Sequence, residues 1–176
     1  MARSADANAL ESIYPFMHRR YDSLKFVPAL LLASVLSAGA QELVRVKRVV
    51  DGDTIILESG ERVRLLGVNA PEVNHPKKPV EAFGKEAAEF TQRMVEGKLV
   101  RLEFDPHVSK QDKSSRTFAY VFLQDGTFLN AEIIRQGYGF VVRSSPPLKY
   151  ESDFVQLELN ARKKRSGLWA LPTKKE

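Results

Sequence analysis

The chain has 176 residues, of which 43% are hydrophobic and 28% charged, so it is a globular protein of one domain plus an appendage rather than a disordered polymer. It has no cysteine, which excludes disulfide frameworks and thiolate metal sites. The three histidines (His18, His75 and His107) lack zinc spacing, so a bound metal must be held by oxygen atoms, as calcium and magnesium are. The net charge of +5 suits phosphate polymers and ordinary solvated surfaces alike, so it does not decide the function.

The N-terminal segment has the pattern of a bacterial secretory signal. An apolar run at residues 26–36 follows Arg19, Arg20 and Lys25, and the small residues Ala38 and Ala40 come directly before Gln41. The run is short for a membrane span, which needs about 20 residues. We therefore expect residues 1–40 to direct the protein to the periplasm or the medium and to be removed.

Alternatives remain for this segment. The sixteen residues before Met17 are unusual, and a start at Met17 would give a basic region of ordinary length. An uncleaved membrane anchor through residues 26–40, or an ordinary buried helix, is the competing interpretation. After cleavage we expect no stable membrane association.

The mature chain begins with a predicted three-stranded meander. Residues 42–50 alternate between apolar and basic side chains, as a half-exposed strand does. Asp51-Gly52 predicts a turn into a strand at 54–58, and Ser59-Gly60 predicts a second turn into a strand at 61–68.

Helical and strand patterns then alternate. Apolar residues recur at helical spacing within 80–96, and Gly97 follows as a C-cap. Further elements are predicted as strands at 98–104 and 116–123 and helices at 129–137 and 150–165. Five strands and about three helices predict an α+β fold: a small Greek-key barrel of the OB type over residues 41–170, followed by a basic tail at 171–176.

Several sequence blocks resemble those of the staphylococcal nuclease (thermonuclease) family. They run in the family's order from about Val44 to Trp169: DGDT at 51–54, RLLGVNAPE at 64–72, HPKKP at 75–79, DKSSRTFAYV at 112–121 and RQG at 135–137. DGDT alone is a weak signal because Asp-Gly turns are common, but the ordered set is specific. The resemblance implies an OB-fold phosphodiesterase that acts on DNA and RNA and depends on Ca²⁺.

The resemblance also assigns roles to individual residues. Those that fall on the family's catalytic positions are Arg64, Glu72 and Arg116. Metal-binding positions fall on Asp53, on Asn69 and on the backbone carbonyl of Ala70. Substrate binding is expected of four basic residues: Lys77, Lys78, Lys113 and Arg143.

These residue types suit phosphodiester hydrolysis. Arg64 and Arg116 can each donate two hydrogen bonds to phosphate oxygens and remain charged, which stabilises the added negative charge of the transition state. Glu72 follows a proline in a loop, where its carboxylate can accept a proton from the attacking water or orient it. Asp53 offers a hard anionic oxygen, with Asp51 close by. We expect the three catalytic side chains to face solvent in a substrate cleft.

The chain departs from the family pattern at a few positions. Asn69 is neutral where aspartate is common, so one formal charge is lost from the expected metal site. Ser114 and Ser115 stand in place of a Tyr-Gly pair, and Arg143 and Ser145 stand about where base-stacking tyrosines are found. Loss of stacking is expected to reduce affinity more than the chemical step.

Two functions of different class follow from these patterns. The first is an exported, metal-dependent nuclease of the endonuclease type, working as a monomer on DNA, RNA or both. The second is a non-catalytic OB-fold module that only binds nucleic acid. The joint presence of Asp53, Arg64, Glu72 and Arg116 favours the enzyme, because a pure binder has no need of the set.

Overall fold

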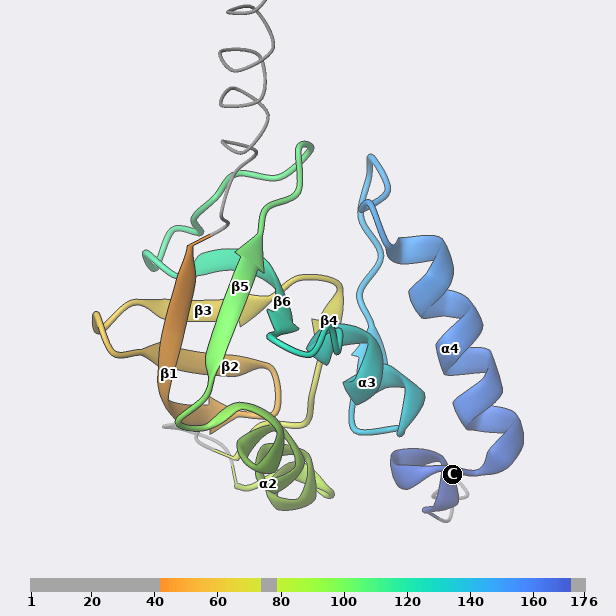
Figure 1. The fold of residues 1–176 in the computed structure, drawn as a ribbon. Coiled ribbons are helices and arrows are strands. Elements are labelled where there is room, and N and C mark those ends of the chain that lie inside the picture. The colour runs from red at the N-terminus through yellow and green to blue at the C-terminus, as the bar shows by residue number, and fades with distance from the viewer. Residues whose placement is uncertain (1–41, 74–78, 172–176) are drawn as a thin grey trace, which may run out of the picture. The chain divides into compact units, whose positions relative to one another are not determined.

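The chain divides into residues 1–40 and residues 41–176, and the computed structural model describes residues 42–73 and 79–171 of the second unit (Figure 1). The predicted signal or anchor at 1–40 lies outside the described residues. So does all but the first residue of the predicted tail at 171–176.

Five strands close into a barrel, which confirms the predicted α+β fold of the OB type. Around the barrel they run in the order β1-β2-β3-β6-β5. Their bounds are β1 (Leu43–Asp51), β2 (Thr54–Leu57), β3 (Arg62–Leu65), β5 (Leu99–Glu103) and β6 (Thr117–Leu123). Neighbouring strands are antiparallel except β3 and β6, which are parallel, with Arg64 opposite Phe118.

Apolar side chains from every strand fill the barrel interior. Val46, Ile55, Val63, Val100 and Val121 are completely buried, one from each strand. Full burial of a valine- or leucine-sized side chain stabilises the fold by roughly 1.5–3 kcal/mol. Because successive side chains of a strand point to opposite faces, the barrel wall also sets which residues face outward.

The strand expected at 61–68 is interrupted. β3 ends at Leu65, and β4 (Val68–Asn69) pairs instead with β7 (Phe140–Val141) in a separate two-stranded sheet. Gly67 lies between them with φ +73°, and a Cβ there would come within 2.7 Å of the Phe154 ring. The turn therefore requires glycine, and it carries Asn69 away from the barrel wall.

Within the described residues 42–73 and 79–171 there are three α-helices, as predicted, and a short 3₁₀ helix follows them. They are α2 (Gly84–Val95), α3 (Leu129–Arg135), α4 (Glu151–Lys164) and η1 (Gly167–Ala170). α2 begins later than the predicted residue 80, because Phe83 adopts a left-handed conformation with φ 70°. α2 packs against β1 at one end of the barrel, and α4 lies alongside α3 (Figure 1).

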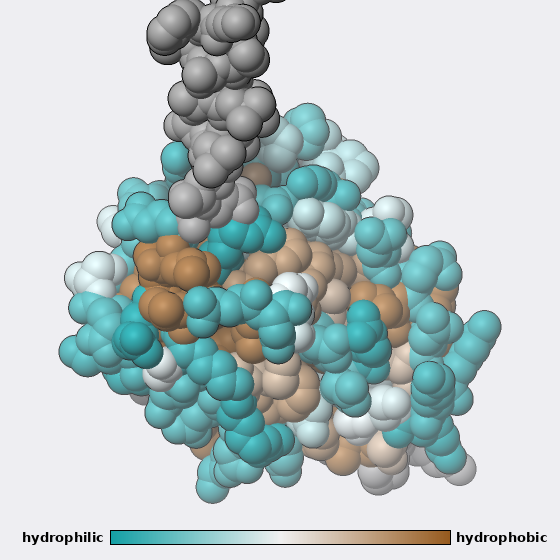
Figure 2. All heavy atoms as spheres, viewed as in Figure 1, coloured by the Kyte–Doolittle hydropathy of each residue, from teal (hydrophilic) through white to brown (hydrophobic). Residues whose placement is uncertain are grey.

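The face shown in Figure 2 carries hydrophilic side chains around its rim and apolar side chains near the start of β1 and across its middle. Leu43, the first residue of β1, is 42% exposed.

Within residues 42–73 and 79–171, no helix has the length and apolar character needed to cross a membrane.

Candidate active site

The DGD turn between β1 and β2 is packed into the protein rather than exposed at its surface. Gly52 is buried, and a Cβ on it would lie 2.7 Å from the Cβ of Ala70 and 2.9 Å from that of Ala87. Only glycine fits this close approach, which sets the turn against the start of the 70–73 segment. Asp53 is consequently only 5% exposed.

The buried Asp53 carboxylate accepts hydrogen bonds on both oxygen atoms. The hydroxyl of Thr54 donates to its Oδ1 at 2.9 Å, and the backbone N–H of Ala70 donates to its Oδ2 at 2.6 Å. Arg64 forms an ion pair with Oδ1. A buried carboxylate needs such partners, because an unpaired one is strongly destabilising.

Arg64 connects this carboxylate to β4. Its Nη1 contacts Asp53, and its Nη2 donates to Oδ1 of Asn69 at 2.9 Å. The side chain is only 16% exposed, which is more enclosed than the expected solvent-facing position. Burial, and then the nearby positive charge of Arg116, lower the pKa of Arg64 to about 10. Arg64 therefore stays charged at neutral pH.

Arg116 reaches the same site through the parallel pairing of β3 and β6. Arg64 lies opposite Phe118, and Arg116 precedes Phe118 by two residues. Residues two apart share a face of an extended segment, so the pairing places both arginines outside the barrel on one side. At this position the positive charge of Arg116 is close enough to lower the pKa of Arg64.

Glu72 stands on the 70–73 segment that leaves β4, and its residue is exposed. The negative charges of Asp51 and Glu72 both raise the pKa of Arg64. The carboxylate of Glu72 therefore lies close enough to interact with the Arg64 guanidinium. The backbone here is held in place: the N–H of Glu72 donates to Glu81 Oε2 and the N–H of Val73 donates to Asp51 Oδ1, both at 3.1 Å. Asp53, Arg64, Glu72 and Arg116 are thus brought together.

The oxygen atoms at this site have the chemistry that a hard cation requires. Asp53 Oδ2 and Asn69 Oδ1 each accept one described hydrogen bond, and an oxygen of this kind can accept two. Within residues 42–73 and 79–171, no group of three or more His, Asp or Glu side chains could hold a metal by itself. Asp53 Oδ2 and Asn69 Oδ1 are oxygen atoms of the kind that calcium prefers, and a calcium ion held by them would need its other ligands from backbone carbonyls, water and substrate.

The expected substrate-binding residues have different outcomes. Lys113 is exposed in the turn before Arg116, and Arg143 is exposed beside a hollow of about 190 Å³ that Arg64, Phe118 and Val142 also line. Lys77 and Lys78 lie outside the described residues.

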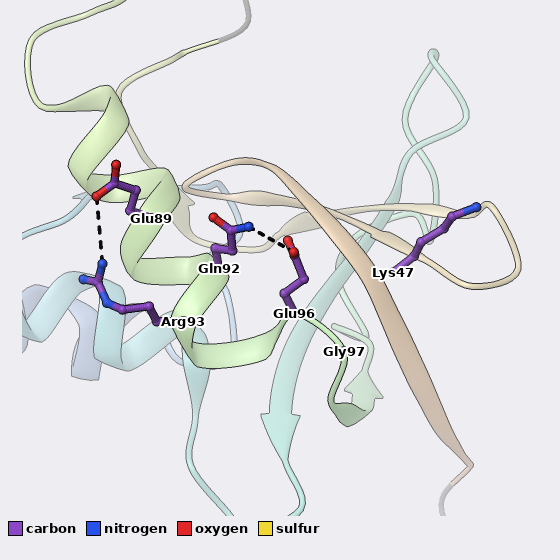
Figure 3. A pocket seen from close by; sticks show the side chains of 6 residues that line it. All are labelled: Lys47, Glu89, Gln92, Arg93, Glu96 and Gly97. Carbon is purple, nitrogen blue, oxygen red and sulfur yellow. Dashed lines mark hydrogen bonds and ion pairs between the residues drawn. The ribbon is translucent and has the colours of Figure 1, made fainter.

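A larger hollow, of about 840 Å³, lies between β1 and α2 and contains none of the predicted site residues (Figure 3). Its charged and polar side chains bind one another, Arg93 with Glu89 at 4.0 Å and Gln92 with Glu96 at 2.9 Å. Lys47 extends away from them in Figure 3.

Sequence reasoning missed two side chains that support the site. Asp112 binds the side chain of Arg116, and Glu81 binds the backbone of Glu72. The Asp-x-Ser-Ser-Arg spacing of residues 112–116 is typical of a turn in which aspartate binds the following backbone N–H groups, so Asp112 had a recognisable signal. Glu81 had none, because a glutamate before a helix is common.

Comparison with known proteins shows similarity to nucleases. Residues 62–171 match the family described as staphylococcal nuclease homologue. The chain is 41% identical over 127 residues to a thermonuclease of Staphylococcus intermedius, covering 70% of this chain and 74% of that protein. It is 35% identical over 138 residues to a thermonuclease of Staphylococcus hyicus, covering 77% of this chain and 80% of that protein. It is 30% identical over 131 residues to a prophage-derived endonuclease of Bacillus subtilis, covering 72% of this chain and 44% of that protein.

Proposed function

The chain belongs to the staphylococcal nuclease family, and on that basis we propose that it is an exported, calcium-dependent nuclease that hydrolyses phosphodiester bonds of DNA, RNA or both. The relatives named thermonuclease and endonuclease support the nuclease activity. Calcium dependence rests on the oxygen donors around Asp53. Export rests on the sequence pattern of residues 1–40.

The observation that carries the proposal is the pair of arginines on one outer face of the barrel, with the carboxylate of Glu72 close enough to act on Arg64. Arg64 lies in β3 and Arg116 directly precedes β6, and the charges of Arg116 and Glu72 both act on Arg64. Two like charges held close together repel each other, so a bound anion between them would be stabilised. A phosphodiester is such an anion.

The chemistry then follows from the groups present. Arg64 and Arg116 bind the non-bridging oxygens of the phosphate and stabilise the charge that grows on them during attack. Glu72 accepts a proton from the attacking water, or orients that water. Asp53 and Asn69 hold the guanidinium of Arg64 from two sides and so fix its direction.

Calcium, when bound by Asp53, Asn69 and the carbonyl of Ala70, would supply further positive charge to the phosphate oxygens. Asp53 is the anionic member of this set.

A non-catalytic nucleic-acid-binding module is the competing function. Basic residues alone would serve it. The negative charge of Glu72, which acts on Arg64, opposes phosphate binding there and serves a catalyst better than a binder. We therefore favour the enzyme.

The decisive experiment incubates the purified protein with single- and double-stranded DNA and RNA, with calcium or with EGTA. We expect cleavage with calcium, none with EGTA, and a loss of orders of magnitude in the Arg116→Ala protein. Binding without cleavage under all conditions would establish the binding module instead. The substrate series also measures the preference between DNA and RNA.

Export is tested separately, in the host that produces the protein. N-terminal sequencing of the mature protein should begin near Gln41, after the Ala38-x-Ala40 pattern. Recovery of the intact N-terminal segment in the membrane fraction would show an anchor. Sedimentation of the mature protein should show the expected monomer.

A further inference from the structure

The turn at residues 112–116 is built around one carboxylate. Oδ1 of Asp112 accepts the backbone N–H groups of Ser114 at 2.8 Å and Arg116 at 2.9 Å. The backbone N–H of Asp112 donates to the carbonyl oxygen of Arg116 at 3.0 Å. The carboxylate is therefore fixed relative to the backbone of Arg116.

The other oxygen of this carboxylate binds the arginine side chain. Arg116 Nε donates to Asp112 Oδ2 at 2.6 Å, a short charge-assisted hydrogen bond. In the described part of the chain, the side-chain hydrogen bonds of Arg116 use Nε alone. The two terminal nitrogens, which form the fork that suits two phosphate oxygens, remain available.

We propose that Asp112 is a positioning residue for catalysis, which holds Arg116 through Nε so that its two terminal nitrogens are presented to the phosphate. This inference rests on the proposed nuclease function. It assigns Asp112 a role that acts through Arg116 and not by contact with the substrate.

The negative charge of Asp112 also supports its role in positioning Arg116. Arg116 lowers the pKa of Arg64 and Asp112 raises it, so Asp112 offsets part of the repulsion between the two arginines. The backbone N–H of Arg116, together with its side chain, holds the pKa of Asp112 below its usual value. Asp112 is thus ionised at neutral pH. Without its charge, less of the repulsion between the two guanidinium groups would be offset.

The competing role for Asp112 is only to shape the turn. Asp125 provides a matched control, because its Oδ1 accepts the backbone N–H of Thr127 at 2.9 Å in another exposed turn, without an arginine as side-chain partner. Asp112→Asn keeps an oxygen for the backbone N–H groups and removes the charge that holds Nε. Asp125→Asn makes the same chemical change away from the site.

The experiment measures calcium-dependent hydrolysis of bis(4-nitrophenyl) phosphate and of DNA by the full-chain protein. We expect Asp112→Asn to lower kcat about 30-fold on both substrates with KM changed less than about twofold, because a displaced fork weakens transition-state binding most. Its thermal midpoint should match that of Asp125→Asn, which keeps full activity. Should Asp112→Asn fail to fold, Asp112→Ser supplies the comparison, since a serine hydroxyl also accepts N–H groups in such turns.

A double-mutant cycle separates positioning from turn structure. In an Arg116→Ala background, Asp112→Asn should have almost no further effect, because the group it positions is gone. An equal loss in both backgrounds would overturn the positioning role and leave the proposed function standing. Full activity of Arg116→Ala alone would overturn the catalytic role of Arg116 and this inference with it. Absence of hydrolysis by the unmodified protein would overturn the proposed function itself.

Discussion

Glu72 and Glu81 bind each other through reciprocal hydrogen bonds. The N–H of Glu72 donates to the side chain of Glu81 at 3.1 Å, and the N–H of Glu81 donates to the carbonyl oxygen of Glu72 at 2.9 Å. Gly84 packs against the same carbonyl, since a Cβ on it would lie 2.9 Å from that oxygen. The backbone of the proposed base is thus held on both sides while its carboxylate stays exposed.

We expect Glu81→Ala to lower kcat about tenfold, because the backbone of Glu72 loses one of its two supports and a small misplacement of a catalytic group is costly. Glu81→Gln keeps an acceptor oxygen and should retain most of the activity. Glu86→Ala, in the first turn of α2, is the matched control. Steady-state kinetics of the three variants checks this, and equal activity of Glu81→Ala and Glu86→Ala would contradict it.

The two arginines should differ in their effect on stability. Arg64→Ala leaves the buried carboxylate of Asp53 without its cation, so the free energy of unfolding should fall by about 3 kcal/mol in the absence of calcium. Arg116→Ala removes a half-exposed ion pair and should change the free energy of unfolding by less than about 1 kcal/mol. Both should lower turnover by orders of magnitude. Urea denaturation in EGTA measures the difference, and equal losses would show that Asp53 does not depend on Arg64.

Asn69→Asp should strengthen calcium binding. Affinity in oxygen sites rises with the number of charged ligands, and this substitution adds a carboxylate with almost no change of shape. We expect the half-saturating calcium concentration to fall several-fold in calorimetric titration without substrate. Unchanged or weaker binding would mean that Asn69 serves only to hold Arg64, whose Nη2 it already binds at 2.9 Å.

Asp105 should contribute to the pH dependence of stability. Burial acts to raise the pKa of its carboxyl, but hydrogen bonds from the Lys149 N–H, the Tyr120 hydroxyl and the His107 N–H outweigh it and lower the pKa. A carboxyl with a lowered pKa stabilises the fold above its ordinary pKa, and that stability is lost as pH falls through the lowered value.

Asp105→Asn should therefore lower the free energy of unfolding at pH 7 by about 1–3 kcal/mol, since one acceptor oxygen is replaced by a donor. The difference in the free energy of unfolding between the variant and the unmodified protein should become smaller below about pH 4. Thermal unfolding at a series of pH values measures it, and a constant difference would contradict the assigned pKa direction.

The sequence predicted those parts of the molecule that depend on local patterns. Apolar patterns and turn signals predicted the barrel strands, and the turn at Asp51-Gly52 lies where it was expected. The strand expected at 61–68 is divided, because the fit of Gly67 against Phe154 is a contact between residues far apart in the chain. Periodicity carries no information about such a contact.

The candidate site was predicted as a set of residues, and the resemblance supplied the set. Its geometry was not predictable. The enclosure of Arg64 comes from Asp53 and Asn69, which local propensity cannot place beside it. The support of Glu72 by Glu81 likewise depends on how the segment before α2 returns to the 70–73 segment.

The parallel pairing of β3 with β6 has a consequence for the timing of activity. The two arginines are far apart in the chain and meet only when these strands pair. In an unfolded chain, such as the proposed export would require during transport, the two arginines are therefore apart. For the nuclease proposed above, activity would begin only when the barrel has closed.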